Sequence, residues 1–143
     1  MENKRLYGKL CFLHRQMSRE NNRLFAEFDL TPVQMNVLFH IYVKMREGQK
    51  MNQKDIEKFV NLRASSVSSL ITNLENDGFL TRTLTDGNKR AKYLELTEKG
   101  KLVCVKNSML FDECDSAIQS ALSADEQETF EALLQKIIDS ISK

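Results

Sequence analysis

Residues 63–77 carry the pattern that most restricts the fold of this 143-residue chain. Val67, Leu70, Ile71 and Leu74 follow the i, i+3, i+4, i+7 spacing of a helix that buries one face. A generic surface helix carries Lys and Glu on its other face, because Ser and Thr form helices less readily. Here that face holds short hydrogen-bonding side chains, namely Ser65, Ser66, Ser68, Ser69, Thr72 and Asn73. By itself the pattern fits either an ordinary solvated face or a binding face.

Two helix start signals precede this segment. The run 31–34 combines a threonine cap, proline at the first helical position and a capping-box glutamine, and it predicts a helix over 32–46. The run 52–55 supplies an asparagine cap and predicts a short helix that ends at residue 59 or 60. A short helix is therefore expected directly before the polar-faced one.

The sequence after the polar-faced helix predicts a β-hairpin. FLTRTL (79–84) and AKYLEL (91–96) have the residue types of strands, and the six residues between them include Asp-Gly-Asn. Those residues tolerate the positive φ angles of tight turns. The hairpin tip is basic, because it carries Lys89, Arg90 and Lys92.

Apolar stripes mark both ends of the chain. Residues 5–28 predict one long helix with a stripe of Leu6, Leu10, Leu13, Met17 and Leu24. Thr97-Glu98 opens another helix, whose stripe is Val103, Leu110, Cys114 and Ala117. A capping box at 123–126 opens a last helix with a stripe of Phe130, Leu133, Leu134, Ile137, Ile138 and Ile141. These helices either pack on their own chain or cover a partner chain, and the surplus of apolar surface favours the partner.

This order predicts a mainly α fold with a small β-hairpin wing, a winged helix-turn-helix with dimerisation helices at both termini. In such a fold the polar-faced helix enters the major groove, where short side chains bond base edges or phosphates. The basic tip reaches the phosphates or the adjacent minor groove. Gln53 and Arg63 are candidate phosphate contacts, although both residue types are common on protein surfaces.

The runs LTPVQMNVL, NQKDIEKFVN, SSVSSLITNLENDGFLTR and NKRAKYLELTEKG resemble the multiple antibiotic resistance regulator (MarR) family of bacterial transcription regulators. The resemblance implies one domain over 1–143, with dimerisation helices at 1–30 and 101–143 and a winged lobe at 31–100. It further implies a homodimer on a palindromic operator, with Ser65 to Asn76 as the recognition helix and Arg90 as the wing arginine. Two positions depart from the family pattern: Asn88 replaces an aspartate, and Glu57 replaces a small alanine.

The resemblance also implies a regulator, more often a repressor, that a small phenolic or anionic effector releases from DNA. Thiol oxidation is a second release mechanism, because Leu10 to Leu13 is similar to the organic-hydroperoxide-sensing branch of the family. Lys9, His14 and Arg15 stand near Cys11 and favour the reactive thiolate. The alternative, a thiol that only packs in the core, stays open.

Other functional classes lack the residues they need. The chain has no glycine-rich phosphate loop, nucleophile elbow or H-E-x-x-H motif, so we expect no enzyme and no cofactor. Its two histidines have no metal-ligand spacing, and its three cysteines fit reduced thiols. No apolar run approaches the roughly 20 residues of a membrane span, so we expect a cytoplasmic protein without a membrane partner.

The charge balance sharpens the expected mode of binding. Lys and Arg number 21 against 20 Asp and Glu, but residues 1–100 hold 17 basic and 12 acidic side chains while 101–143 hold 4 and 8. A few placed contacts, rather than a large positive field, therefore carry DNA affinity. The alternative class is a winged-helix interaction module or antirepressor without DNA binding, since fold alone does not fix function.

Overall fold

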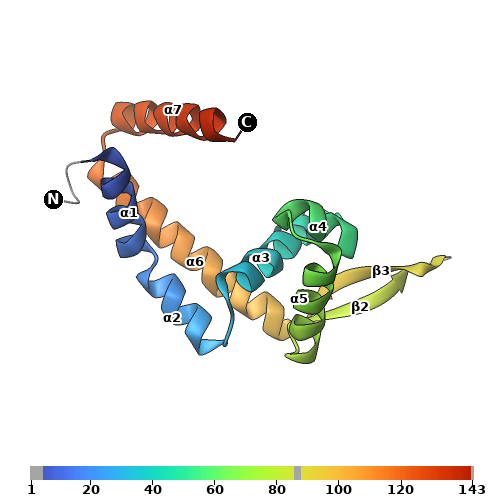
Figure 1. Ribbon diagram of the computed structural model, residues 1–143. Helices are drawn as coiled ribbons and strands as arrows, with labels where there is room; N and C mark the ends of the chain where they lie inside the picture. The colour runs from blue at the N-terminus through green and yellow to red at the C-terminus, as the bar shows by residue number, and fades with distance from the viewer. Residues whose placement is uncertain (1–4, 86–87, 143) are drawn as a thin grey trace. The chain divides into compact units, whose positions relative to one another are not determined.

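The computed structural model describes residues 5–85 and 88–142, apart from the side chains of residues 85 and 88–91. The chain forms two compact units, Met1–Asn107 and Ser108–Lys143. In chain order the elements are α1 (Leu6–Met17), α2 (Arg19–Glu27), α3 (Pro32–Arg46), β1 (Met51–Asn52), α4 (Gln53–Val60), α5 (Ala64–Asn76), β2 (Leu80–Thr85), β3 (Asn88–Leu96), α6 (Glu98–Ala121) and α7 (Ala124–Ile141). Figure 1 labels the helices and the strands β2 and β3. The predicted mainly α fold with a β-hairpin is confirmed.

Capping boxes set the starts of α3 and α4 where the sequence predicts them. The Thr31 hydroxyl accepts the Gln34 backbone N–H at 3.2 Å, and the Gln34 side chain accepts the Thr31 N–H at 2.9 Å. Asn52 and Asp55 make the same exchange at the start of α4, at 3.0 and 2.9 Å. Each box satisfies two backbone donors that the first helical turn leaves without a partner.

The buried faces of α3, α4 and α5 form the core of the winged lobe. Val67, Ile71 and Leu74 of α5 are fully buried, while Leu70 is half-buried. Left-handed Asn61 makes the turn between α4 and α5. The fully buried side chains from the neighbouring helices are Met35, Val37, Leu38, Ile41 and Ile56. Burial of each such side chain contributes roughly 1.5–3 kcal/mol.

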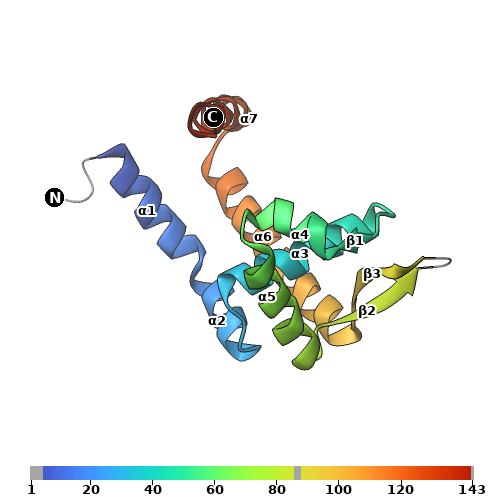
Figure 2. The same cartoon turned by 45° about the vertical axis from the view of Figure 1, so that its right-hand side comes forward.

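The hairpin belongs to a three-stranded antiparallel sheet in the order β1-β3-β2. The sequence does not predict β1, because two residues are too short to show an alternating pattern. Met51 of β1 pairs with Leu94, and Leu80 of β2 pairs with Leu96. Leu94 and Leu96 are buried while Lys92 is exposed, so this lysine lies beyond the edge of the core. Figure 2 shows the β2–β3 hairpin extending away from the helices of the lobe.

The single helix predicted over 5–28 is wrong, because two helices, α1 and α2, meet at Ser18. The Ser18 hydroxyl donates to the His14 carbonyl, which also accepts the Ser18 backbone N–H at 2.8 Å. Such back-bonding by serine competes with the helical ladder and bends helices. Of the predicted stripe, Leu24 is buried, whereas Leu6, Leu10 and Leu13 are exposed within this chain.

The stripe predicted for α6 is only partly correct. Within the first unit, Val103, Cys104 and Asn107 of α6 are buried, whereas Ala117 in the second unit is exposed. Burial along α6 depends on which elements pack against it as well as on the helical period of its apolar residues. The sequence shows the period but not the packing.

In the second unit, α7 begins as predicted, at a capping box between Ser123 and Glu126 with bonds of 3.2 and 2.9 Å. Its apolar residues are exposed.

The junction between α5 and α6 is fixed by the LTEKG segment of the sequence. The Thr97 hydroxyl donates to the Gly78 carbonyl at 2.6 Å and accepts the Gly100 N–H at 3.1 Å. Lys99 donates to the Asp77 carbonyl at 2.8 Å and lies 4.3 Å above the Phe79 ring. Lys99 thus binds one of the carbonyls that the C-terminus of α5 leaves without a helical partner.

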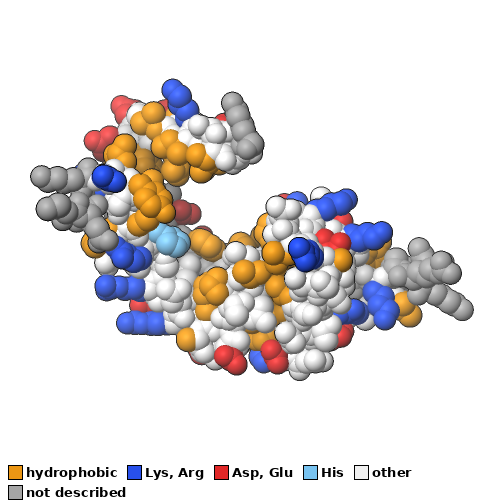
Figure 3. Space-filling view, viewed as in Figure 1, with side chains coloured by type: hydrophobic (Ala, Val, Ile, Leu, Met, Phe, Trp, Pro, Cys, Tyr) orange, Lys and Arg blue, Asp and Glu red, His pale blue; other side chains and the backbone are white. Residues whose placement is uncertain are grey.

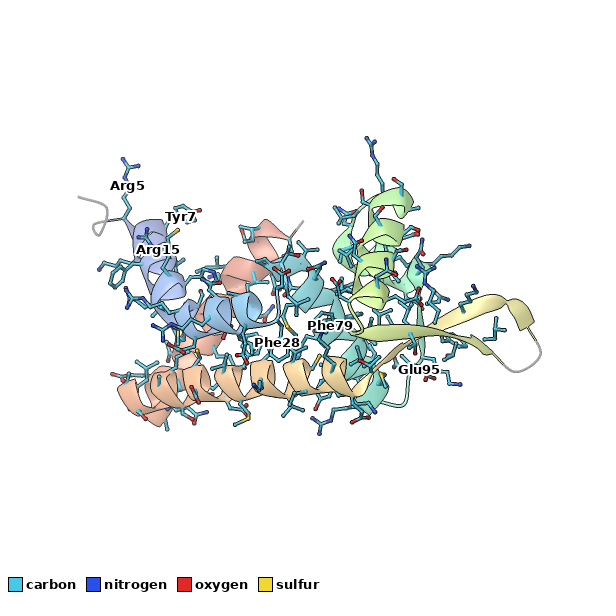
Figure 4. The ribbon with its side chains drawn as sticks, turned by 90° about the horizontal axis from the view of Figure 1, so that it is seen from below. Arg5, Tyr7, Arg15, Phe28, Phe79 and Glu95 are labelled. Atoms are coloured by element: carbon cyan, nitrogen blue, oxygen red, sulfur yellow. The ribbon has the colours of Figure 1, made fainter. Side chains whose placement is uncertain are left out.

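Phe28 covers the other side of this junction. Its ring meets Phe79 edge to face at 6.4 Å, and Figure 4 shows the two side chains lying close together. Lys106 of α6 lies 5.4 Å from the Phe28 ring and 3.5 Å from the Glu27 carboxylate. Phe28, after α2, therefore packs against the segment that follows α5 and against the first half of α6.

Candidate nucleic-acid interface

The polar face of α5 lies opposite its buried face. Ser65, Ser69 and Thr72 follow the outer line of the helix and are exposed. Ser66 and Asn73 are exposed along one flank, and Ser68 is half-buried along the other. The structure thus brings six predicted contact residues together on one helix. Short hydroxyl and amide side chains on an exposed helix are the kind of groups that bond base edges in the major groove of B-form DNA, which admits an α-helix.

The two predicted phosphate contacts differ in availability. Arg63 is exposed and occupies the N-cap position of α5 in extended backbone conformation. Gln53, at the start of α4, is half-buried, and its amide donates to the Glu57 carboxylate at 3.2 Å. Glu57, which departs from the family pattern, therefore holds Gln53 along α4. A contact between Gln53 and DNA would have to replace this bond.

The predicted wing contacts lie on β3. Lys92 is exposed and pairs with Leu84 of β2. Lys89 and Arg90 have strand backbone, but their side chains lie outside the described residues, as does the turn residue Asp86. Figure 3 shows Lys and Arg side chains gathered on the part of the winged lobe from which the hairpin leaves.

Arg82 of β2 joins the hairpin to α5, a role that the sequence pattern alone does not indicate. Its guanidinium Nη2 donates to the Thr72 hydroxyl at 3.0 Å, and its Nε lies 3.8 Å from the Glu75 carboxylate. Glu75 and Arg82 both lie in the run SSVSSLITNLENDGFLTR, one of those on which the family resemblance rests.

Cys11 is half-buried in α1, one helical turn after Tyr7. A hydrogen bond with the Cys11 side chain raises the pKa of the Tyr7 phenol above its ordinary value. Figure 4 shows Tyr7 near the start of α1. Cys104 differs, because it is fully buried and burial raises the pKa of its thiol to about 12. Cys104 is therefore a core residue, and Cys114 is half-buried.

A groove of about 290 Å³ lies between α3 and α4. Its lining is mainly apolar and consists of Val33, Asn36, Phe59, Val60 and Leu62. On the same two helices, the His40 ring stacks on Phe59 with ring centroids 3.8 Å apart. Burial and the Lys44 charge lower the pKa of His40 below its ordinary value of 6.5.

The described part of the chain contains no cluster of three or more His, Cys, Asp or Glu side chains that could hold a metal ion. None of its helices is both long and apolar enough to span a bilayer.

Comparison with known proteins identifies the function of this arrangement. The sequence model of the winged helix DNA-binding domain matches residues 30–100. The chain is 32% identical to the HTH-type transcriptional regulator SarZ of Staphylococcus saprophyticus over 139 residues, covering 92% of this chain and 91% of SarZ. It is 30% identical to the uncharacterized HTH-type transcriptional regulator YdcH of Bacillus subtilis, covering 84% of this chain and 80% of YdcH.

A solved structure supplies the link to DNA. The Staphylococcus aureus MepR–DNA complex matches with a TM-score of 0.73 and 27% identity, over 91% of this chain and 95% of that one. MepR is a regulator of the MarR family. The fold, the exposed polar helix and these relatives agree with one another. The chain is therefore a DNA-binding transcriptional regulator and belongs to the MarR family of winged helix-turn-helix proteins.

Proposed function

We propose that the protein is a homodimeric, cytoplasmic repressor that recognises a palindromic operator with α5. The observation that carries the proposal is the division of α5 into a fully buried apolar face and an exposed face of hydroxyl and amide side chains. The MepR–DNA complex supports it, because a protein of this fold is seen there on DNA.

Each proposed contact has a defined part. Ser65, Ser66, Ser68, Ser69, Thr72 and Asn73 face the major groove, where hydroxyls and amides bond base edges. Arg63 and, after leaving Glu57, Gln53 bind phosphates beside the recognition helix. Lys89, Arg90 and Lys92 bind the backbone at the wing, which adds affinity without base preference.

The homodimer covers apolar side chains that the single chain leaves exposed. On α1 they include Leu6, Tyr7, Leu10, Phe12 and Leu13, and on α7 they include Leu133, Ile137 and Ile141. Figure 3 shows hydrophobic side chains on the visible surface of α7. Isolated apolar residues are normal on a protein surface, but whole stripes indicate a protein interface. In this proposal, helices from 1–30 and 101–143 form the dimer and 31–100 forms the DNA lobe.

An effector is proposed to release the repressor, either a small phenolic or anionic molecule or an oxidant acting on Cys11. The bond between Tyr7 and Cys11 favours the second route, since it places a phenol beside the thiol. In that step the Cys11 thiolate attacks a hydroperoxide, which breaks the O–O bond, forms the sulfenate and releases an alcohol. Peroxide should then release wild-type protein from its operator but leave the Cys11→Ser variant bound.

Selection from a randomised duplex library tests the function directly. We expect wild-type protein to enrich a palindrome whose half-sites lie about 10 base pairs apart, because each recognition helix occupies one major groove on the same side of the duplex. Native mass spectrometry of the complex should show two chains for each duplex. One chain on an asymmetric site would contradict the dimeric mode, and enrichment of no sequence would contradict specific recognition.

A further inference from the structure

We propose that Arg82 is a positioning residue that fixes the Thr72 hydroxyl as a hydrogen-bond donor toward the DNA. Arg82 thereby determines which kind of base edge Thr72 of α5 recognises. The inference rests on the proposed role of α5 in operator recognition and adds a residue from the hairpin to it.

The geometry holds the guanidinium at two points. Nη2 of Arg82 lies 3.0 Å from the Thr72 hydroxyl oxygen, and Nε lies 3.8 Å from the Glu75 carboxylate one turn away. The Arg82 side chain is 24% exposed, so the surrounding protein restricts its motion. Its backbone is fixed as well, since Arg82 pairs with buried Leu94 inside the sheet. The contact therefore joins a rigid strand to the exposed face of the recognition helix.

The chemistry of the pair assigns the direction of the Thr72 hydroxyl. A hydroxyl has one proton to donate and two lone pairs, whereas a guanidinium only donates. Arg82 occupies one lone pair of Thr72, so the hydroxyl proton points elsewhere. Within the described part of the chain, no protein acceptor for that proton is found, and Thr72 is exposed. The proton is available to a group outside the protein.

A group that meets this proton must accept a hydrogen bond. In the major groove the acceptors are N7 and O6 of guanine, N7 of adenine and O4 of thymine. The amino groups of cytosine and adenine are donors, and the positive charge of Arg82 behind the hydroxyl disfavours them. Thr72 therefore favours base edges that carry hydrogen-bond acceptors. A threonine hydroxyl without such a neighbour binds donors and acceptors alike.

Arg82 also counters a charge that would oppose DNA. The Glu75 side chain is 38% exposed on the flank of α5 next to Thr72. Without Arg82 its carboxylate would stand uncompensated near the phosphates and weaken binding to every sequence. This second effect has to be separated from the first, and the Glu75→Gln change does so because it removes the charge.

The test compares base preferences in the randomised duplex selection. Four proteins are used: wild type, Thr72→Val, Arg82→Met, and the double variant Glu75→Gln with Arg82→Met. We expect wild type to prefer an acceptor-bearing base at one position of each half-site. Thr72→Val, Arg82→Met and the double variant should all lose that preference, by about fivefold, at the same position.

Affinity for the selected duplex is measured by fluorescence anisotropy. A further protein that carries both Thr72→Val and Arg82→Met completes a double-mutant cycle with wild type and the two single variants. In the Thr72→Val background, adding Arg82→Met should change the affinity for the duplex with the preferred base by less than about twofold, because the hydroxyl is already absent. Arg82→Lys keeps a cationic donor and should retain more of the preference than Arg82→Met. Thermal unfolding checks that each variant is folded, and Arg82→Ala, which also lacks a donor, replaces Arg82→Met if that protein unfolds.

Several outcomes overturn the inference. Arg82→Met and the double variant could alter a different position from Thr72→Val, or weaken binding to all sequences equally. Thr72→Val could leave the preference unchanged while Ser69→Glu abolishes binding, in which case the proposed function stands and the role of Arg82 does not. If wild type enriches no sequence, both the proposed function and the inference fail.

Discussion

The carbonyl oxygen of Phe79 occupies the place where a side chain on Gly100 would begin. A Cβ atom built on Gly100 would lie 2.1 Å from that oxygen, well inside van der Waals contact. The same carbonyl accepts the Thr97 N–H at 3.0 Å. The start of α6 thus approaches the segment after α5 closely enough to exclude any residue but glycine, which explains the glycine of the LTEKG segment.

Gly100→Ala is accordingly expected to destabilise the protein by about 2–4 kcal/mol, because the obstructing atom is backbone and cannot rotate away. Alanine in a helix would otherwise stabilise by roughly 0.5–1 kcal/mol relative to glycine. Urea unfolding followed by circular dichroism measures the change. Lys101→Ala, at the exposed neighbouring position, should shift stability by less than about 0.5 kcal/mol. Equal stabilities for the two variants would show that the close approach is not retained in solution.

The proposed dimer predicts that Ile137→Glu yields a monomer. Ile137 is 51% exposed in the single chain, and burying a carboxylate in an apolar interface is strongly unfavourable. Sedimentation equilibrium should show a mass near 33 kDa for wild type, twice the 16.5 kDa chain, and 16.5 kDa for the variant. The control Ala132→Glu places the same charge on the opposite side of α7 and should stay dimeric. A monomeric wild type would remove the homodimer from the proposed function.

The cysteines should differ in reactivity. Cys104 is fully buried and its thiol pKa is raised to about 12, whereas Cys11 and Cys114 are half-buried. Alkylation with iodoacetamide at pH 8 should therefore modify Cys104 on the order of a hundredfold more slowly than Cys11. Peptide mapping gives each rate, and denaturant should make the rates similar. Fast modification of Cys104 in the native protein would contradict its place in the core.

His40 predicts a specific loss of stability in acid. Burial lowers the pKa of His40 in the folded protein below 6.5, so the unfolded chain takes up the proton first as pH falls. The stabilisation of the folded protein by neutral His40 is complete above pH 6.5. It is lost as the pH falls from 6.5 through the lowered pKa of the folded state. Glu47 and Asp55 oppose the shift, and Lys44 adds to it. Between pH 7.5 and pH 5 the melting temperature of His40→Gln should therefore fall by less than that of wild type. An identical fall for the two proteins would contradict the lowered pKa of His40.

Local signals in the sequence predicted most of the helix starts. The three capping boxes are complete within four residues each, so the starts of α3, α4 and α7 required no knowledge of the fold. The polar face of α5 was visible for the same reason, because its contrast with the buried stripe repeats every turn.

Features that depend on neighbours in space were missed or wrong. The pairing of β1 with β3 joins residues some 40 positions apart, and the bond between Arg82 and Thr72 crosses from a strand to a helix. At Ser18 the helix is interrupted where the serine hydroxyl bonds the His14 carbonyl, although the apolar pattern of the sequence continues across this point. The described buried residues of α6 all lie in its first half, and the periodicity of the apolar residues does not show this change along the helix.

Ser69→Glu tests whether the exposed face of α5 binds DNA. Ser69 is exposed on the outer line of the helix, so the added charge should leave the melting temperature unchanged and repel the phosphates. Ser120→Glu on α6 is the matched control, an exposed helical serine with the same change in charge. We predict that affinity for the selected duplex falls by at least about a hundredfold for Ser69→Glu and stays unchanged for Ser120→Glu. Equal affinities for the two variants would contradict the assignment of α5 as the recognition helix.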